Sequence, residues 1–239
     1  MGQNQRVTLD DLTRMKEQRS TDRATLDALL DEVLVGTLAT VTGDGRPWAV
    51  PMLFARDGDR VLLHGSTGAG ALRQVAAGAE AVLAVHVIDG LVMATSMFEH
   101  SATYRSAVVR GPLQRLTGEA AVEALDLISD GLVPGRRAEV RGMLRKEVSA
   151  TVALALDLTD DNWILKVADS DTDEELFEEG VWTGVVPLHT TYGVPQRSAW
   201  LGDDVPVPPS VEALRRAQRG AASGGDGLLA QDRRDGLTS

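Results

Sequence analysis

Residues 35–66 read VGTLATVTGDGRPWAVPMLFARDGDRVLLHGS, and this stretch decides the fold class. Three apolar runs, at 35–41, 47–56 and 60–66, are separated by the short segments TGDGR and DGD. Glycine and aspartate at this spacing are typical of tight turns between antiparallel strands. The stretch therefore predicts three consecutive strands joined by hairpin turns. Connections this short disfavour parallel β-α-β units, whose crossovers need about a dozen residues or more.

The remaining pattern predicts a mainly β, α+β protein: roughly six short antiparallel strands, with helical additions, in a closed or split β-barrel. Further strands are expected at 79–89, 91–97, 103–111 and 112–118, followed by a late hairpin of TVALALDL and NWILKV. Apolar spacing predicts helices at 21–33, with Thr21 or Asp22 as its cap, at about 69–77, at 119–132 and at 136–148.

The chain is expected to divide into three parts. Residues 1–20 form a polar N-terminal segment, 21–200 the barrel domain, and 201–239 a Pro/Gly-rich mobile tail. Within the domain, 181–195 is partly apolar and is expected to dock on the body. The segment 171–180 holds six carboxylates and no base, which is typical of a solvated loop or short helix.

Composition excludes several classes of function. The net charge of −11 argues against non-specific binding to nucleic acid or to a membrane surface. The absence of cysteine excludes disulfides, thiol catalysis and zinc–thiolate sites. No apolar run approaches the roughly 18–20 residues of a membrane-spanning helix, and the N-terminus lacks a hydrophobic signal core. A cytoplasmic location is expected.

The glycine-rich segment after the third strand, HGSTGAGA, raises the question of a phosphate site. A strand, a glycine-rich turn and a helix start often cradle phosphate, because N–H groups at a helix start favour anions. Ala71 and Leu72 replace the Lys and Ser/Thr of a P-loop, and Arg73 replaces the third glycine of a dinucleotide fingerprint. The other interpretation is a tight turn that needs positive φ.

The histidines are the other candidates for chemistry, each with a structural alternative. His64 ends a strand beside the glycine loop, His86 lies inside an apolar strand, and His189 follows in a Thr-rich turn. The segment FEHSATYRS offers a cluster to one ligand: His100, Ser101, Tyr104, Arg105 and Ser106. No helical H-x-x-x-H supports a metal site, and no G-x-S-x-G elbow supports a serine hydrolase. No metal ligand is predicted.

Several motifs together resemble a known family. These are VGTLATVTGDGRPWAVPMLFARDGDRVLLHGSTGAGALRQV, HSATYRSAVVRGPLQRLTG and VWTGVVPLHTTYGVP, within about residues 20–195. In this order they resemble the pyridoxamine 5′-phosphate oxidase-related flavoproteins, and more narrowly the branch of nitroimidazole-resistance (Nim) type flavin-nucleotide-binding proteins. The resemblance implies a split-barrel homodimer that binds FMN in clefts at the subunit interface. The phosphate would then belong to FMN.

The resemblance also implies which residues contact the cofactor. They are Thr37, Ala39, Thr40, Val50, Pro51, Met52, His64, Gly65, Ser66, Thr67, Arg73, Tyr104, Arg105 and Ser106. One feature departs from the family, which commonly places Lys or Arg a few residues after the histidine. Here Arg73, Arg105 or Arg46 takes that role, or phosphate binding is weaker, or the cofactor differs. The pyridoxal-phosphate pocket of the true oxidases is not evident in this sequence.

The function implied by the resemblance is a flavin-dependent oxidoreductase. A reduced nicotinamide, NAD(P)H, would donate hydride to FMN, and a small acceptor would take it. His64 or His100 would be the catalytic proton donor. Haem or a deazaflavin are the alternative cofactors on related barrels, and a histidine would then be a candidate haem ligand. A non-enzymatic flavin or haem carrier or sensor is the competing function, and a purely structural interaction module is the third.

Overall fold

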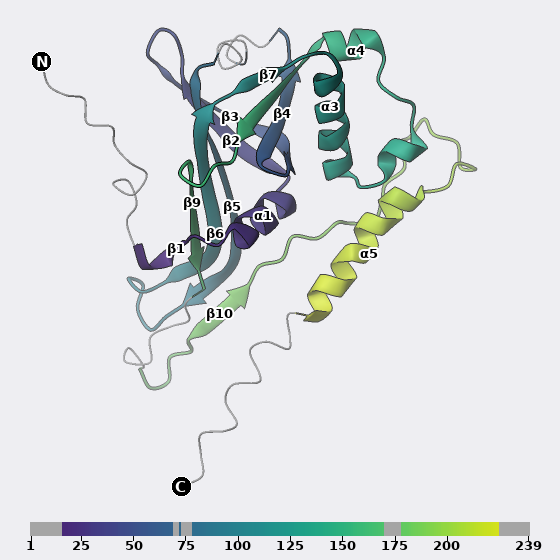
Figure 1. The fold of residues 1–239 in the computed structure, drawn as a ribbon. Helices are drawn as coiled ribbons and strands as arrows, with labels where there is room; N and C mark the ends of the chain where they lie inside the picture. Colours follow the sequence, from purple (N-terminus) through teal and green to yellow (C-terminus); the bar gives the residue numbers. More distant parts are fainter. Residues whose placement is uncertain (1–15, 69–71, 73–77, 170–177, 225–239) are drawn as a thin grey trace, which may run out of the picture. The chain divides into compact units, whose positions relative to one another are not determined.

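The structure, a computed structural model, describes residues 16–68, 72, 78–169 and 178–224. The chain forms two compact units, one of residues 1–132 and 142–188 and the other of residues 133–141 and 189–239. The first unit contains all of the strands shown in Figure 1. The domain boundaries at residues 20 and 200 stay predictions.

The three strands predicted at the start of the domain are confirmed as β2 (Val35–Val41), β3 (Pro47–Asp57) and β4 (Arg60–Ser66). Both pairs are antiparallel, with Val41 opposite Pro47 and Asp57 opposite Arg60. Gly45 and Gly58 have φ of 81° and 58°, a left-handed conformation that glycine adopts without steric cost. The turn residues therefore set the register of the first two hairpins.

The next hairpin is longer than predicted. Separate strands at 79–89 and 91–97 are wrong, because β5 (Glu80–Met93) is continuous and pairs with β6 (Ser101–Pro112) along its length. The register shifts between Ile88 and Gly90, which marks a β-bulge. A Cβ on Gly90 would lie 2.7 Å from Val185 Cγ1, so this glycine admits a neighbouring strand and does not end β5. That neighbour is β10 (Gly184–Pro187), which confirms that part of 181–195 docks on the body.

The late hairpin is wrong in its pairing. Strand β8 (Thr151–Asp157) pairs with β4 and with β7 (Gln114–Leu116), whereas β9 (Trp163–Ala168) pairs with β6 and with β1 (Arg19–Ser20). The loop between them crosses from one sheet to the other. The Asn162 side chain holds that crossing by donating hydrogen bonds to the carbonyls of Arg110 and Asp157.

The two sheets form a split barrel because two segments of the chain, β3 and the β6–β7 segment, contribute to both sheets. Strand β3 pairs with β2 over Pro47–Leu53 and with β4 over Phe54–Asp57. On the other side, β6 runs through the buried Leu113 into β7, which pairs with β8. The strand order β1-β9-β6-β5-β2-β3-β4-β8-β7 thus returns to the β6–β7 path. This antiparallel barrel with helical additions confirms the predicted fold class.

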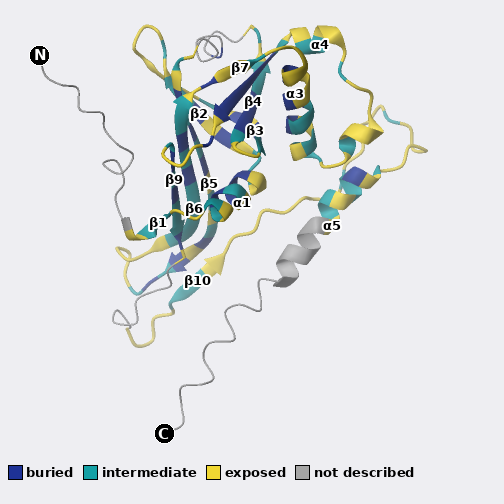
Figure 2. Ribbon diagram, viewed as in Figure 1, coloured by how far each residue is buried: buried dark blue, intermediate teal, exposed yellow. Residues whose placement is uncertain are grey.

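Two hydrophobic cores lie on opposite sides of the barrel wall. Helix α1 (Arg23–Glu32), capped by Asp22 as predicted, places Leu26, Leu29 and Leu30 in the core inside the barrel. Helix α3 (Gly118–Leu132) packs on the outside, over β3, β4 and β8. Figure 2 shows buried positions on both α3 and the strands beside it. Adjacent residues Leu62 and Leu63 face the outer and inner cores respectively.

The helix predicted at 136–148 is wrong. The segment instead forms a 3-10 helix, η3 (Arg136–Glu139), and a short helix, α4 (Arg145–Ser149), with an extended stretch that contains Gly142 between them. A second 3-10 helix, η2 (Lys16–Gln18), precedes β1, and α5 (Pro209–Gly224) belongs to the second unit. The helix predicted at 69–77 and the acidic loop at 171–180 lie largely outside the described residues.

Within the part of the chain that the structure describes, no helix is both long enough and apolar enough to cross a membrane.

Candidate functional site

An uncharged surface covers the outward side of β2 and the first half of β3; we call it the outer face. It consists of four cross-strand pairs: Val35–Leu53, Thr37–Pro51, Ala39–Ala49 and Val41–Pro47. These side chains alternate with the inward residues Leu38, Met52 and Phe54, which belong to the barrel core. Val41 is 61% exposed, although a solvent-facing sheet surface normally carries polar side chains. An exposed apolar surface of this kind indicates a binding or interaction site.

The centre of the outer face has small side chains. Thr37 lies between Pro51 of β3 and Ala84 of β5, and Ala39 lies between Ala49 and Val82. Short side chains on adjacent strands leave a shallow floor on which a flat ring system can rest. The outer face with Ala84 is therefore the candidate cofactor floor.

The predicted cofactor residues on β2 and β3 divide between the two sides of the barrel wall. Thr37, Ala39 and Pro51 lie on the outer face, whereas Val50 and Met52 pack in or against the core. The Thr40 hydroxyl donates a hydrogen bond to the Glu80 carbonyl at 2.7 Å. Side chains of a strand alternate between its two faces, so a continuous run of three residues cannot line one surface.

His64 lies where β4 leaves β3. It is the first residue of β4 beyond the ladder that ends at Phe54–Leu63, and it pairs with Ala153 on the other side. Its Nδ1 is buried and has no hydrogen-bond partner among the described residues. Burial lowers the pKa of the His64 imidazole, because the charged form is poorly solvated there. His64 is therefore a neutral imidazole at the split between the sheets, and its Nδ1 is shielded from solvent.

The glycine loop is partly explained by packing. A Cβ on Gly65 would lie 2.1 Å from Leu72 Cδ1, so Gly65 makes room for a side chain of the barrel core. The Thr67 N–H donates to the Ala150 carbonyl, and the Gly68 N–H donates to Ser66 Oγ. These two N–H groups are therefore engaged within the chain. The rest of the glycine loop lies outside the described residues.

The three candidate arginines differ in their surroundings. Arg105 pairs across the ladder with Val87, which packs against the core, and its guanidinium binds Asp89 and Glu32. These two carboxylates raise the pKa of Arg105. The structure thus places Arg105 on the side of α1, away from the outer face. Arg46 is an exposed residue of the β2–β3 turn, 3.5 Å from Asp44, and Arg73 lies outside the described residues.

The cluster in FEHSATYRS does not converge on one point. Tyr104 donates its hydroxyl hydrogen to Gln18 Oε1, and Ser106 lies outward between His86 and Lys166 in the register. His100 is exposed in the β5–β6 loop, and His189 is exposed at the start of the second unit's C-terminal segment. No group of three or more His, Cys, Asp or Glu residues is placed to hold a metal ion in the described ranges.

Sequence reasoning missed six of the nine residues of the floor. They are small or apolar residues without reactive groups, so none was a candidate cofactor contact: Val35, Val41, Pro47, Ala49, Leu53 and Ala84. The signal available was the absence of charge at every second position of both strands, from 35 to 41 and from 47 to 53.

Comparison with known proteins agrees with this fold. The sequence profile of the pyridoxamine 5′-phosphate oxidase family matches residues 22–162. No curated protein matches the chain. A solved FAD- and haem-binding protein from Mycobacterium smegmatis is 44% identical, with a TM-score of 0.80 over 83% of this chain and 97% of that one. A flavocytochrome from Azotobacter vinelandii is 29% identical, with a TM-score of 0.77 over 85% of this chain and 94% of its own.

A more distant structure shares the fold alone. It is a protein from Bacteroides thetaiotaomicron described as a 5-nitroimidazole antibiotic resistance protein, 18% identical, with a TM-score of 0.54 over 62% of this chain and 86% of that one. The profile match covers more than half of the chain, and the mycobacterial relative is similar over most of its length. This chain therefore belongs to the pyridoxamine 5′-phosphate oxidase family.

Proposed function

We propose that this protein is a flavin-dependent redox protein that binds its flavin on the outer face and works as a homodimer. The observation that carries the proposal is the floor of small, uncharged residues at Thr37, Ala39, Pro51 and Ala84. An isoalloxazine ring needs a flat, largely apolar slot with polar groups at its edges. The relative that is 44% identical is described as binding FAD and haem, which supports a flavin here.

The residues around the floor fit a flavin. Thr37 supplies a hydroxyl within the floor, and His64, at the split, has a buried ring nitrogen with no hydrogen-bond partner in the described part of the chain. Arg46, in the turn that joins β2 to β3, is the described cation closest in sequence to the floor and would face an anionic side chain of the cofactor. A bound flavin supplies hydride and electron transfer, while these residues position it and exclude water. FMN and FAD both meet this description.

The exposed floor supports the proposed homodimer. A flavin bound on the outer face of one chain would expose one face of its ring to solvent. The apolar cross-strand pairs around it would also remain exposed. Each copy carries a net charge of −11, so two copies approach most easily through an uncharged surface. The outer face is such a surface, and pairing through it would enclose the cofactor.

Haem is the second candidate cofactor. The mycobacterial relative is described as binding haem as well as FAD, and the Azotobacter relative is a flavocytochrome. These two align over 83% and 85% of this chain, whereas the Bacteroides protein aligns over 62%. His64, His86, His100 and His189 are the candidate axial ligands. A deazaflavin is less favoured, because its long acidic tail needs a more basic groove than this acidic chain offers.

Reconstitution followed by absorption spectroscopy tests the proposal. The purified protein is mixed with FMN, FAD or haem, desalted, and its spectrum recorded. We expect flavin bands with the wild type, and at least a tenfold weaker flavin affinity for Thr37→Trp, which fills the floor. Thr117→Trp, at an exposed position between β7 and α3, is the matched control and should bind normally. A wild type that retains neither flavin contradicts the proposal.

Anaerobic addition of NADH or NADPH to the loaded protein separates an enzyme from a carrier. Bleaching of the flavin bands, followed by their return when an acceptor is added, supports an oxidoreductase. Unchanged bands with both nucleotides favour a carrier or sensor. His64→Gln and His100→Gln test the two candidate proton donors, because loss of one would slow the bleaching while flavin remains bound.

A further inference from the structure

A groove of about 1180 Å³ opens at the end of the sheet where β2 ends and β5 begins. Its walls come from the last residues of β2 and β6, the first residues of β5, and the segment from Leu156 to Asn162 that leads from β8 to β9. Ala39, which belongs to the cofactor floor, also lines the groove. The groove therefore begins where the floor ends, and its described lining residues all belong to the barrel unit.

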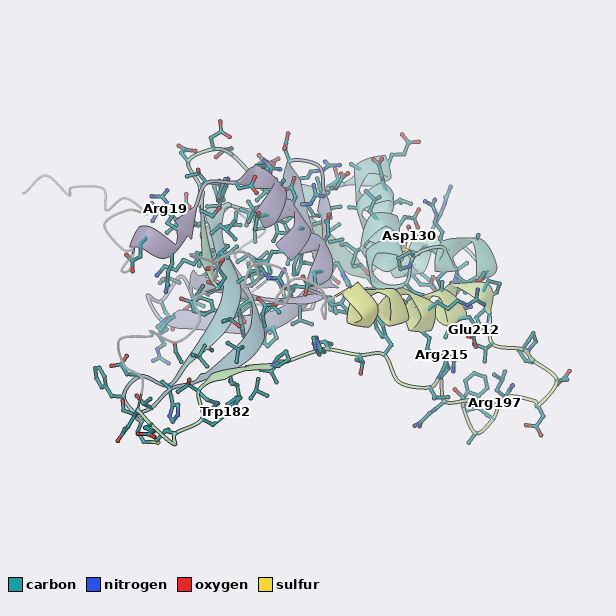
Figure 3. The ribbon with its side chains drawn as sticks, turned by 90° about the horizontal axis from the view of Figure 1, so that it is seen from below. Arg19, Asp130, Trp182, Arg197, Glu212 and Arg215 are labelled. Atoms are coloured by element: carbon teal, nitrogen blue, oxygen red, sulfur yellow. The ribbon has the colours of Figure 1, made fainter. Side chains whose placement is uncertain are left out.

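Among the described residues, two arginines line the groove, and one of them lies in register with the floor. Arg110 of β6 is opposite Val82 of β5, which in turn is opposite Ala39 of β2. Val109 packs in the core, so Arg110 lies on the same outward side of the sheet as Ala39. Adjacent strands are about 4.8 Å apart, which separates the Cα atoms of Arg110 and Ala39 by about 10 Å. The second arginine, Arg19 of the edge strand β1, is labelled in Figure 3.

The loop wall of the groove is fixed by internal hydrogen bonds. The Asn162 side chain donates hydrogen bonds to the carbonyls of Arg110 and Asp157. It also accepts a hydrogen bond from the Thr159 N–H at 2.8 Å. The Thr159 hydroxyl donates to Asp161 Oδ1 at 2.7 Å. The loop is therefore anchored to the end of β6, beside Arg110, and holds its carboxylates in a defined arrangement.

The charges around the groove are mixed. Two guanidinium groups, from Arg19 and Arg110, share the described lining with four carboxylates, from Glu80, Asp157, Asp160 and Asp161. The carboxylates disfavour a simple anion and the guanidinium groups disfavour a metal cation, and the described residues hold no cluster of metal ligands here. A ligand that suits both kinds of charge has an anionic group for the arginines and hydroxyl or amino groups for the carboxylates.

The carboxylates differ in their partners within the chain. Asp157 accepts a hydrogen bond from Gln114 Nε2 at 2.5 Å, and Asp161 accepts one from the Thr159 hydroxyl. Both therefore contribute to the wall of the groove itself. Asp160 lies in the same loop, between these two residues, and is the carboxylate that we assign to the ligand.

An adenosine diphosphate group has the required combination of chemistry. Guanidinium groups bind phosphate oxygens through paired hydrogen bonds, which suits the diphosphate. Ribose hydroxyls donate to carboxylates, as they do at other dinucleotide sites. The apolar side chains of Val41, Val82 and Pro112 also line the groove and suit a planar base. FAD and the hydride donors NADH and NADPH all carry this group.

We propose that the groove binds the adenosine diphosphate group of a dinucleotide whose redox ring lies over the cofactor floor. Arg110 contacts the diphosphate and Asp160 accepts hydrogen bonds from the ribose. The floor and Arg110 are on one side of one sheet, so a single extended ligand can contact both. The proposal rests on the flavin site proposed above and adds a second subsite to it. The dinucleotide is either FAD, as the bound cofactor, or NAD(P)H, as the electron donor.

Calorimetric titration of the flavin-free protein with ADP tests the groove by itself. ADP should bind to the wild type, and at least tenfold more weakly to Arg110→Gln, because a charge-assisted contact to phosphate is lost. Arg115→Gln removes an exposed arginine of β7 outside the groove and should bind ADP like the wild type. Circular dichroism and Tm verify that both variants are folded. A wild type that does not bind millimolar ADP, or an Arg110→Gln variant of unchanged affinity, overturns the proposal.

A second variant tests the ribose contact. The wild type should bind ADP more tightly than 2′,3′-dideoxy-ADP, which lacks both ribose hydroxyls. Asp160→Ala should bind these two nucleotides equally, because the group that distinguishes them is gone. An unchanged preference for ADP in Asp160→Ala contradicts the role assigned to Asp160.

Comparing dinucleotides identifies the source of the adenosine diphosphate group. If it belongs to the cofactor, the wild type binds FAD at least tenfold more tightly than FMN, and Arg110→Gln binds the two equally. If it belongs to the donor, FAD and FMN bind equally, and Arg110→Gln raises the Kd of NADH for the FMN-loaded protein at least tenfold. An Arg110→Gln variant with unchanged affinity for both FAD and NADH overturns the proposal.

The outcomes separate this proposal from the proposed function. A protein that binds ADP through Arg110 but retains no flavin refutes the proposed function and leaves the groove as an adenosine diphosphate site. A protein that retains flavin but does not bind ADP supports the flavin site and overturns the assignment of the groove.

Discussion

Replacing Arg105 by alanine tests whether this residue is a structural clamp. Its guanidinium makes two hydrogen bonds to Asp89, at 3.0 and 2.7 Å, and two to Glu32, at 2.7 and 3.2 Å. Asp89 is the bulge residue of β5, and its carbonyl accepts a hydrogen bond from the Leu188 N–H just after β10. Glu32 ends α1. One side chain thus joins a helix, a bulge and the strand that docks there.

The expected loss in the free energy of unfolding depends on how exposed the Arg105 side chain is. The Arg105 side chain is 24% exposed, between a surface pair worth about 0–1 kcal/mol and a buried pair whose breaking costs about 3–5 kcal/mol. Arg105→Ala also leaves two carboxylates facing each other. We expect a loss of about 2–3 kcal/mol in the free energy of unfolding, measured by urea denaturation at neutral pH.

A double-mutant cycle isolates the clamp from general damage. Glu32→Gln alone should cost about 1 kcal/mol, and the double variant should show a coupling of about 1 kcal/mol with Arg105→Ala. High salt should reduce the coupling, because the pair is partly exposed. A loss below about 0.5 kcal/mol for Arg105→Ala, with flavin affinity sharply reduced, would refute the clamp and return Arg105 to the phosphate role.

Three further predictions concern the cap, the histidine and the glycine loop. Asp22→Ala should lower Tm, because it removes the N-cap of α1. The hydrogen bond from the Thr25 hydroxyl lowers the pKa of Asp22, so the stabilisation by the Asp22 carboxylate is full above about pH 4 and is lost as the pH falls below that. Measuring Tm of the wild type and of Asp22→Asn over a pH series checks this. Burial lowers the pKa of His64, so His64 disfavours the folded state as pH falls below the ordinary value of 6.5; Tm of the wild type should decline there more steeply than Tm of His64→Gln. Gly65→Ala should lower the free energy of unfolding by about 1–3 kcal/mol, because the added methyl group overpacks against Leu72. Leu72→Ala should lower it less in the Gly65→Ala background than in the wild type, as measured by urea denaturation. Equal losses in the two backgrounds would contradict the packing role.

Local signals made the first part of the barrel predictable. Turn glycines at 45 and 58 and alternating apolar residues specify β2, β3 and β4 without reference to the rest of the chain. The cap at Asp22 is equally local, because it depends on N–H groups two and three residues later. The same holds for α3, whose apolar stripe continues over four turns.

The strand pairings that close the barrel could not be predicted from the sequence. Nothing in TVALALDL or NWILKV says that β8 joins β4 and β7 while β9 joins β6, because both strands are apolar and the choice depends on which sheet edge is open. The sequence predicts a break at Gly90, because the strand that this glycine accommodates lies almost 100 residues later, at Val185. The register of the β5–β6 pair, and not the residues next to Arg105 in sequence, decides on which side of the barrel wall Arg105 lies.

The sharing of β3 between the two sheets has a consequence for cooperativity. Its first half completes the sheet with β2, and its second half completes the sheet with β4, while the β6–β7 path makes the same connection on the far side. If the two sheets separated, each would expose its unpaired strand edges and the apolar side chains packed beside them. The amide protons of β3 should therefore exchange only in the global unfolding reaction, and the barrel should melt as one unit despite its two cores.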